Sequence, residues 1–239
     1  MILRLSNSWP LILNFCTEIG RSLLPQACLL CGAPSGTKLI CAECDADLPR
    51  LPRNGCAVCA LPLASGKVCG ACLDSPPRYV RVTAPFIYGF PVNALIHAYK
   101  YGGRLALARP LGAALAQAVA RDVDAIVPMP LAPRRLAQRG FNQALELARV
   151  VAGLTGIPLM PHACRKVIET PSQAALPWGE RAKNVRHAFV CDADLRGKRV
   201  AVMDDVLTTG ATLNELARVL RKAGAREVSG WVVARALPR

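Results

Sequence analysis

The sequence predicts an α/β protein, in which a domain built on a parallel sheet follows a small cysteine-rich domain. Eight of the eleven cysteines lie between Cys28 and Cys72. After residue 80, short apolar segments alternate with segments that keep helical spacing, and this alternation is typical of a parallel sheet covered on both faces. A chain of 239 residues is long enough for one medium domain and one small one. The expected divisions are an opening segment over 1–27, a cysteine domain over 28–73, a linker over 74–82 and the α/β domain over 83–239.

The opening segment resembles neither a membrane span nor a secretory signal. No apolar run in the chain reaches the roughly 18 residues that a membrane span needs. The apolar stretch from Trp9 to Phe15 is interrupted by Pro10 and Asn14. A signal peptide has a longer apolar core and a small-residue cleavage site. We therefore expect an amphipathic opening segment in a cytoplasmic protein.

The chain is strongly basic, with a formal net charge of +14. Arginine supplies 23 of its 30 positive residues, and the guanidinium fork suits phosphate better than a lysine point charge does. The charge therefore makes phosphate-bearing partners plausible. A coding bias that favours arginine over the whole surface explains the same composition, so both interpretations stay open.

The cysteine domain contains an internal duplication. The first set reads CLLC and CAEC, and the second reads CAVC and CGAC, with nine residues between the two pairs of each set. Every cysteine of the second set follows its counterpart by 28 positions. The candidate metal ligands are Cys28, Cys31, Cys41, Cys44, Cys56, Cys59, Cys69 and Cys72.

These pairs are typical of structural zinc. A Cys-x-x-Cys turn points two thiolates at one ion, and a second such turn completes a tetrahedron. Disulfides fit a cytosolic chain poorly, and the spacing is that of zinc ribbons rather than of ferredoxins. We expect each set to close on itself around one Zn²⁺, with interleaving of the two sets as the alternative. Four thiolates leave no open coordination position, so this zinc folds the segment and does no chemistry. Cys16, Cys164 and Cys191 are expected to be small buried hydrophobes.

The elements of the α/β domain follow in order. A linker, "DSPPRYV", leads to a strand-like segment over 81–90. Two helical stretches over 93–120 are separated by Gly102 and Gly103, and a short strand follows over 124–130. Asn142 is a possible cap of the next helix, which ends near Gly153 or Gly156. The last expected elements are strands over 187–190 and 197–203, a helix from 213 to a stop at Gly224, and a closing strand over 227–237.

The segment "VAVMDDVLTTGAT" carries the clearest chemical signal. A buried strand, Arg199–Met203, places Asp204 and Asp205 at its carboxyl end, where open parallel sheets bind ligands. The turn 208–212 then enters a helix whose first amides and dipole favour an anion, and Gly210 lets the backbone come close. This turn suits a monophosphate, and the two carboxylates suit vicinal hydroxyls, so the pattern predicts a ribose 5-phosphate site. A capped helix behind an acidic surface turn explains only part of the pattern. The chain contains neither a P-loop motif nor a dinucleotide-binding motif.

The same segment resembles the phosphoribosyl-pyrophosphate (PRPP) binding signature of type I phosphoribosyltransferases. Three further segments, "AYKYGG", "VPMPLAPRRLAQRGFNQALELA" and "ETPSQAALPWGERAKNVRHAF", together with the cysteine sets, resemble the ComF/GntX family of competence-associated proteins. The resemblance covers residues 20 to 236. It implies a type I phosphoribosyltransferase-like domain with a small N-terminal zinc-ribbon domain, in which four cysteines hold each zinc.

The resemblance also implies roles for individual residues. Asp204 and Asp205 would hold the ribose hydroxyls, directly or through Mg²⁺ and its waters. Lys100 and Arg139 would join them at the reaction centre, and 170–184 has the look of a flap. The residues implied to bind PRPP are Tyr101, Gly102, Gly103, Arg134, Arg135, Asp204, Asp205, Thr208, Thr209, Gly210, Ala211 and Thr212.

The implied activity is a Mg²⁺-dependent pentosyl transfer from PRPP, linked to DNA uptake or to the use of DNA as a nutrient. Mg²⁺ and cationic side chains would stabilise the departing pyrophosphate. The sequence shows no obvious purine or pyrimidine reader, so the acceptor stays open. The alternative is a non-catalytic PRPP sensor, or a component of the uptake machinery that binds nucleic acid or protein. Expected partners are PRPP, single-stranded DNA or a nucleotide-derived acceptor, and DNA-uptake proteins.

Overall fold

The computed structural model describes residues 26–52, 54–168 and 186–238. The predicted opening segment up to residue 25, Cys16 and the predicted flap over 170–184 lie outside these residues. The chain divides into two compact units, Met1–Leu48 and Pro49–Arg239. The first cysteine set belongs to the first unit, and the second set shares the second unit with the α/β elements.

The described part of the first unit is a small ribbon. Strands β1 (Gln26–Ala27) and β2 (Pro34–Gly36) pair antiparallel, and the short helix α2 (Ala42–Ala46) follows. Cys41 caps this helix, because its sulfur accepts a hydrogen bond from the amide of Cys44. The turns of this unit are thus organised by its cysteines.

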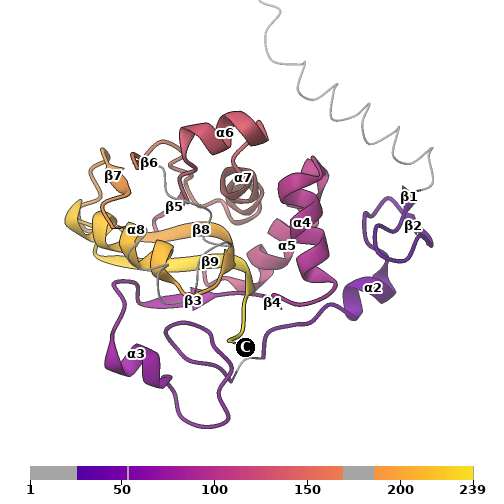
Figure 1. Ribbon diagram of the computed structural model, residues 1–239, viewed down its shortest axis with the longest axis horizontal. Helices are drawn as coiled ribbons and strands as arrows, with labels where there is room; N and C mark the ends of the chain where they lie inside the picture. Colours follow the sequence, from indigo (N-terminus) through magenta and orange to yellow (C-terminus); the bar gives the residue numbers. More distant parts are fainter. Residues whose placement is uncertain (1–25, 53, 169–185, 239) are drawn as a thin grey trace, which may run out of the picture. The chain divides into compact units, whose positions relative to one another are not determined.

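The second unit is built on a five-stranded sheet whose pairings are all parallel, as the sequence predicts (Figure 1). Its path runs β3-β9-β8-β5, and β4 also pairs with β9. Of the two central strands, β9 is buried except at its first residue and β8 is mostly buried, and both are mostly apolar, as strands covered on both faces must be. The bounds are β3 (Arg81–Thr83), β4 (Phe86–Ile87), β5 (Ala125–Pro128), β8 (Arg199–Leu207) and β9 (Glu227–Arg235).

Two strand predictions need correction. The segment expected as one strand over 81–90 forms two, β3 and β4, because Pro85 cannot donate to a ladder in the interval between them. The strand expected over 187–190 starts later, as β7 (Phe189–Cys191), because His187 adopts a left-handed φ of 59°. β7 pairs antiparallel with β6 (Cys164–Lys166) in a separate two-stranded sheet.

Helices cover both faces of the central sheet. α5 and α7 pack on each other and against β9, β8 and β5, and α8 packs on β8, β9 and β7. Asn142 caps α7 by accepting from the amides of Ala144 and Leu145, and Gly156 ends it with a left-handed φ of 74°. The helices are α3 (Gly70–Asp74), α4 (Val92–Tyr101), η1 (Leu105–Leu107), α5 (Ala108–Ala118), α6 (Pro133–Arg139), α7 (Gln143–Thr155) and α8 (Ala211–Lys222).

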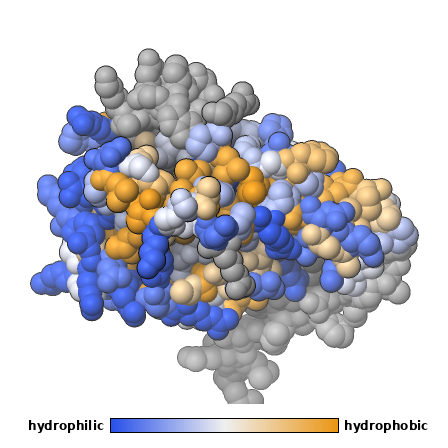
Figure 2. All heavy atoms as spheres, turned by 90° about the horizontal axis from the view of Figure 1, so that it is seen from below, coloured by the Kyte–Doolittle hydropathy of each residue, from blue (hydrophilic) through white to orange (hydrophobic). Residues whose placement is uncertain are grey.

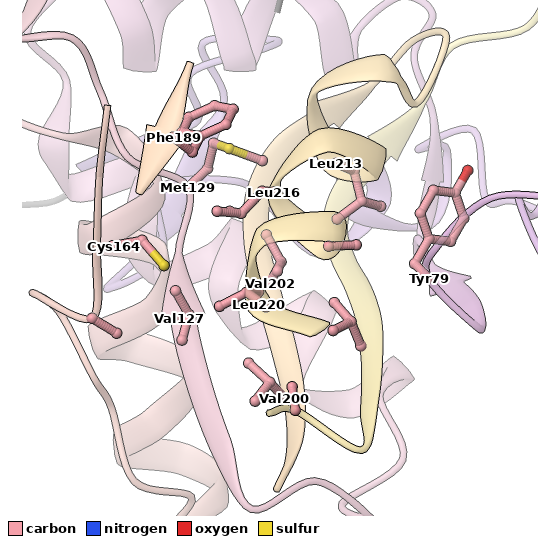
Figure 3. Packing of buried hydrophobic residues seen from close by; sticks show 14 of the residues in the cluster. Tyr79, Val127, Met129, Cys164, Phe189, Val200, Val202, Leu213, Leu216 and Leu220 are labelled. Carbon is pink, nitrogen blue, oxygen red and sulfur yellow. The ribbon is translucent and has the colours of Figure 1, made fainter. Parts of the chain in front are cut away.

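The core on the α8 face joins elements from distant parts of the sequence (Figure 3). Leu213, Leu216 and Leu220 of α8 pack on apolar side chains of the sheet, and Phe189 of β7 and Cys164 of β6 close one side. Tyr79, from the predicted linker, joins the same core. Val58 and Ala60 of the second cysteine set also pack against it. The second ribbon also has its own buried cluster of Cys56, Cys59 and Cys69, and Val58 packs against both clusters.

The surface mixes apolar and hydrophilic areas. Seen from below the view of Figure 1, apolar residues gather near the centre of the face and hydrophilic residues border them (Figure 2). Among the described helices, none combines the length and apolarity needed to cross a bilayer.

Candidate functional site

A cavity of about 800 Å³ opens at the carboxyl end of the central sheet. β5 stops its pairing at Pro128, opposite Met203, whereas β8 continues to Leu207 along β9. β8 therefore extends four residues beyond β5, and Asp204 and Asp205 lie on this extension. The structure corrects one detail here, because the aspartates belong to the strand itself and do not follow it. The overhang leaves the two carboxylates at the edge of a space that β5 does not fill.

The two carboxylates have different surroundings. Asp205 is buried, and the Nζ of Lys100, at the end of α4, lies 2.7 Å from its Oδ2. Asp204 is partly open to the cavity, and its Oδ1 accepts a hydrogen bond of 2.8 Å from the amide of Asp205. Lys166 of β6 also lines the cavity. The acidic pair is thus neutralised in part by lysines from two separate elements.

The electrostatics of the pair follow from this arrangement. Burial raises the pKa of Asp204 to about 7, and the charge of Asp205 adds to the effect, whereas Lys100 and Lys166 oppose it. Burial lowers the pKa of Lys100, but the adjacent Asp205 outweighs it, and the net pKa of Lys100 is raised. The Lys100 side chain is therefore held as a cation at neutral pH, whereas Asp204 titrates near neutral pH.

The segment 207–211, from the last residue of β8 to the first residue of α8, forms the second half of the site and is called the phosphate loop below. Gly210 has a left-handed φ of 81° and directly precedes α8. The Thr209 hydroxyl accepts a hydrogen bond of 3.2 Å from the amide of Ala211, so it fixes the turn. Thr208, Gly210, Ala211 and Thr212 line the cavity. A helix N-terminus behind a glycine turn offers unpaired amides and a positive dipole end to an anion.

Basic residues of α6 and β6 line the same cavity as this loop. Arg135 and Arg139 of α6 line the cavity together with Lys166. The guanidinium of Arg139 donates to Oε1 of Gln143 and lies 5.0 Å from the centre of the Tyr101 ring. Burial lowers the pKa of Lys166, and the positive charge of Arg135 lowers it further. The cavity thus combines two carboxylates on one strand with cations from α4, α6 and β6.

Most of the residues that the sequence predicts for the site meet at this cavity. Tyr101 is exposed at its rim, at the end of α4. Gly102, Gly103, Arg134 and Thr209 do not line it. The predicted site residues that line it are Lys100, Tyr101, Arg135, Arg139, Asp204, Asp205, Thr208, Gly210, Ala211 and Thr212.

The sequence does not predict several of the residues near the site. Lys166 and Gln143 line the cavity, and Tyr79 and Arg235 contact the phosphate loop from behind. Arg235 carried a usable signal, because a charged residue inside the apolar segment "WVVARAL" needs partners if that strand is buried. The sequence gives no comparable sign for the other three.

The eight cysteines form two separate clusters, as the self-closing arrangement requires. In each set of four, all sulfurs lie within 4.8 Å of one another. The sulfurs of Cys31 and Cys41 are 3.7 Å apart, and those of Cys59 and Cys69 are also 3.7 Å apart. A tetrahedron with Zn–S bonds of about 2.3 Å has edges of about 3.8 Å, so both clusters fit Zn²⁺.

Backbone amides prepare one sulfur of each cluster to bind a cation. The sulfur of Cys28 accepts from the amide of Cys41 at 3.4 Å, and the sulfur of Cys56 accepts from the amide of Cys69 at the same distance. Burial raises the pKa of both thiols, but the amide hydrogen bonds outweigh it and lower each pKa to about 6. These amides act as the outer shell that orients metal ligands and holds them as thiolates.

The family models match both parts of the chain. The model described as "Double zinc ribbon domain" matches residues 19–73, and the model described as "Phosphoribosyl transferase domain" matches residues 181–237. The second match includes the strand with the two aspartates and the phosphate loop.

Two curated relatives and one solved structure are similar to this chain. "Competence protein F" of Haemophilus influenzae is 35% identical over 158 residues, which cover 61% of this chain and 69% of that protein. "DNA utilization protein YhgH" of Salmonella typhi is 33% identical over 173 residues, 69% of this chain and 76% of the relative. A structure of "glutamine phosphoribosylpyrophosphate (PRPP) amidotransferase" from B. subtilis is 26% identical, with a TM-score of 0.40, over 56% of this chain and 30% of that one.

Proposed function

Because this chain belongs to the ComF family of competence-associated proteins, with a double zinc ribbon and a phosphoribosyltransferase domain, we propose that its cavity binds PRPP with Mg²⁺. The proposed activity is transfer of the phosphoribosyl group to an acceptor. One observation carries the proposal: a pair of carboxylates on the overhang of β8 lines the same cavity as the phosphate loop and the basic residues of α6 and β6.

Each part of the cavity matches one part of PRPP. The amides of the phosphate loop and the α8 dipole suit the 5-phosphate. Asp204 and Asp205 suit the ribose hydroxyls, since an ionised carboxylate accepts hydrogen bonds from hydroxyl groups. Lys100, Arg135, Arg139 and Lys166 supply positive charge for the pyrophosphate. When bound, Mg²⁺ would neutralise charge that develops on the leaving pyrophosphate.

The protein's contribution to the reaction is positional and electrostatic. Loss of pyrophosphate leaves positive charge on the sugar ring, and the acceptor supplies the electron pair that forms the new bond. Asp204 and Asp205 would fix the ribose while Lys100, paired with Asp205, stays charged beside the leaving group. Preorganised charges of this kind commonly supply the largest share of a rate enhancement.

Calorimetric titration of the zinc-replete protein with PRPP and Mg²⁺ tests the proposal. Wild type should bind, and Asp205→Asn should lose most of the affinity, because the ribose hydroxyls lose an ionised acceptor. Asp192→Asn is the matched control, since this exposed carboxylate pairs with Arg165 and does not line the cavity. Absence of binding to a folded wild type would refute PRPP as the ligand. Pyrophosphate release with candidate acceptors then separates an enzyme from a sensor.

One observation supports single-stranded DNA as a further partner. Tyr101 is 65% exposed at the cavity rim, and the Arg139 guanidinium lies over its ring. Aromatic faces beside arginines are typical of surfaces on which bases stack. Binding to an oligonucleotide should weaken steeply with salt, and Tyr101→Ala should reduce the affinity without changing the salt slope. An affinity for the oligonucleotide that does not change with salt concentration would speak against a nucleic-acid surface.

A further inference from the structure

Arg235 connects the second ribbon to the phosphate loop. It is 5% exposed and ends β9, and among the described residues its guanidinium donates to four backbone carbonyls. Nε donates to the carbonyl of Cys59 at 2.9 Å, and Nη1 donates to those of Leu207 at 3.1 Å and Thr208 at 2.6 Å. A buried guanidinium is costly unless its donors are satisfied, so these carbonyls and the arginine hold each other in place. One end of this bridge is a zinc-ligand residue, and the other is the phosphate loop.

Tyr79 supports the same loop from a second direction. Its side chain is buried beside Leu213 in the first turn of α8 (Figure 3). The hydroxyl comes so close to Gly210 that a Cβ there would lie 2.8 Å from the Tyr79 oxygen. The adjacent amide of Arg78 donates to Oδ1 of Asn214 at 2.6 Å, so this segment is fixed to α8. The chain that leaves the second ribbon thus forms the back of the phosphate loop.

The second ribbon also packs against the core that supports the phosphate loop. Ala60 follows its first Cys-x-x-Cys turn and has a φ of 58°, where the equivalent residue of the first ribbon is Gly32 with a φ of 75°. A non-glycine residue in the left-handed region costs about 1–2 kcal/mol. Ala60 packs against the α8 core together with Val58. The second ribbon therefore carries an apolar contact to the core at the position where the first carries glycine.

We propose that Arg235 and Tyr79 are positioning residues that couple zinc binding in the second ribbon to ligand binding at the phosphate loop. Loss of zinc releases the Cys59 turn, because four-thiolate ribbons fold around their metal. Arg235 then loses its contact with the Cys59 carbonyl and no longer fixes the carbonyls of Leu207 and Thr208. The choice of PRPP as the ligand rests on the proposed function, but the coupling itself does not.

Coupling of this kind must act in both directions. Removal of zinc from the second ribbon should weaken PRPP binding, and bound PRPP should raise the affinity of that ribbon for zinc by the same factor, measured by competition with a chelator. Typical coupling free energies correspond to changes of about 5- to 150-fold in affinity. We expect a change of at least about tenfold, since the bridge is buried and direct.

Two cysteine variants provide a matched test in the full-length protein. Cys59→Ser removes one thiolate from the second ribbon, and Cys31→Ser removes the equivalent thiolate from the first, which supplies none of the carbonyls that Arg235 binds. Titration with PRPP and Mg²⁺ should show about tenfold or greater weakening for Cys59→Ser only. Arg235→Lys should weaken binding similarly, and adding Cys59→Ser to it should cost little more. Equal effects of the two cysteine variants, or fully additive effects of Cys59→Ser and Arg235→Lys, would overturn the coupling.

Hydrogen exchange separates this inference from the proposed function. Amides of residues 207–212 should exchange faster in Cys59→Ser than in wild type or Cys31→Ser, without any ligand present. If wild type fails to bind PRPP but this difference appears, the ligand is wrong and the coupling stands. If Arg235→Lys does not fold, Tyr79→Phe, which removes only the hydroxyl beside Gly210, should raise exchange in the same residues. Unchanged exchange of 207–212 in Cys59→Ser and Tyr79→Phe would refute the coupling.

Discussion

Asp204 should make the ligand-free protein less stable at neutral pH, and Asp204→Asn should remove this cost. The pKa of Asp204 is raised to about 7 by burial and by Asp205, whereas an unfolded aspartate has a pKa of about 3.9. Between these values the folded state holds a proton that the unfolded state has lost. Stability therefore falls as pH rises through this window and is constant above it.

The magnitude follows from the shift. Three pH units at about 1.4 kcal/mol each give an upper limit of about 4 kcal/mol. Asp204 is partly open to the cavity, where solvent screens its charge, so we expect about 2 kcal/mol. Asn keeps the oxygen that accepts from the Asp205 amide, so the substitution removes the charge without removing that hydrogen bond.

Urea unfolding at pH 5, 6.5 and 8 measures the effect. Asp204→Asn should be more stable than wild type by about 2 kcal/mol at pH 8, and the gain should shrink towards pH 5. Asp124→Asn is the control of opposite sign, because hydrogen bonds from Arg199 lower the pKa of Asp124 to about 2 and its charge is favourable in the fold. A variant at position 204 that is no more stable than wild type at pH 8, or a gain that does not vary with pH, would refute the reasoning.

Three further predictions test other contacts, each with a second substitution beside it for comparison. Lys100→Met should destabilise the protein by about 3 kcal/mol in urea unfolding, because it leaves the buried Asp205 without its cation, and Lys100→Arg should restore part of the loss. Gly112→Ala should cost about 1–3 kcal/mol, since the new Cβ would lie 2.8 Å from Cγ1 of Val150, and Val150→Ala in the same chain should recover most of it. Gly156→Ala should lower the melting temperature because its φ is 74°, whereas Gly153→Ala, inside α7 with open space around it, should raise it.

The sequence predicts those features of this protein that depend on residues close together in the chain. The cysteine sets lie at fixed spacing, so their clusters follow from the turns themselves. Apolar strands that alternate with helical periodicity are enough to predict the parallel sheet. Asn142 is a correctly predicted cap, because capping involves only the next two or three residues.

The remaining features depend on contacts between distant segments. The extension of β8 beyond β5 arises because β9 continues beside it, and no pattern within "VAVMDDVL" shows where the neighbouring strand stops. Lys166 reaches the cavity because β6 pairs with β7, which packs on α8. The bridge from Arg235 to Cys59 spans 176 positions of the chain. Predicting it would require knowing in advance that the second ribbon packs on the α/β core.

The raised pKa of Asp204 also predicts a proton signature of ligand binding. With a pKa of about 7, Asp204 is about half protonated at pH 7 in the ligand-free protein. Ribose hydroxyls that donate to the carboxylate favour its ionised form, so binding should release up to about half a proton at pH 7. Calorimetry in buffers of different ionisation enthalpy measures this number directly.

The proton release should vary with pH in a defined way. It should fall towards zero at pH 9, where Asp204 is already ionised, and it should be absent in Asp204→Asn at every pH. Proton uptake at pH 7, or a release that persists in the variant, would mean that Asp204 does not meet the ligand as a carboxylate. The stability that the ligand-free protein loses through the Asp204 charge would then not be recovered when the ligand binds. Agreement would instead show that a destabilising charge is kept because the ligand satisfies it.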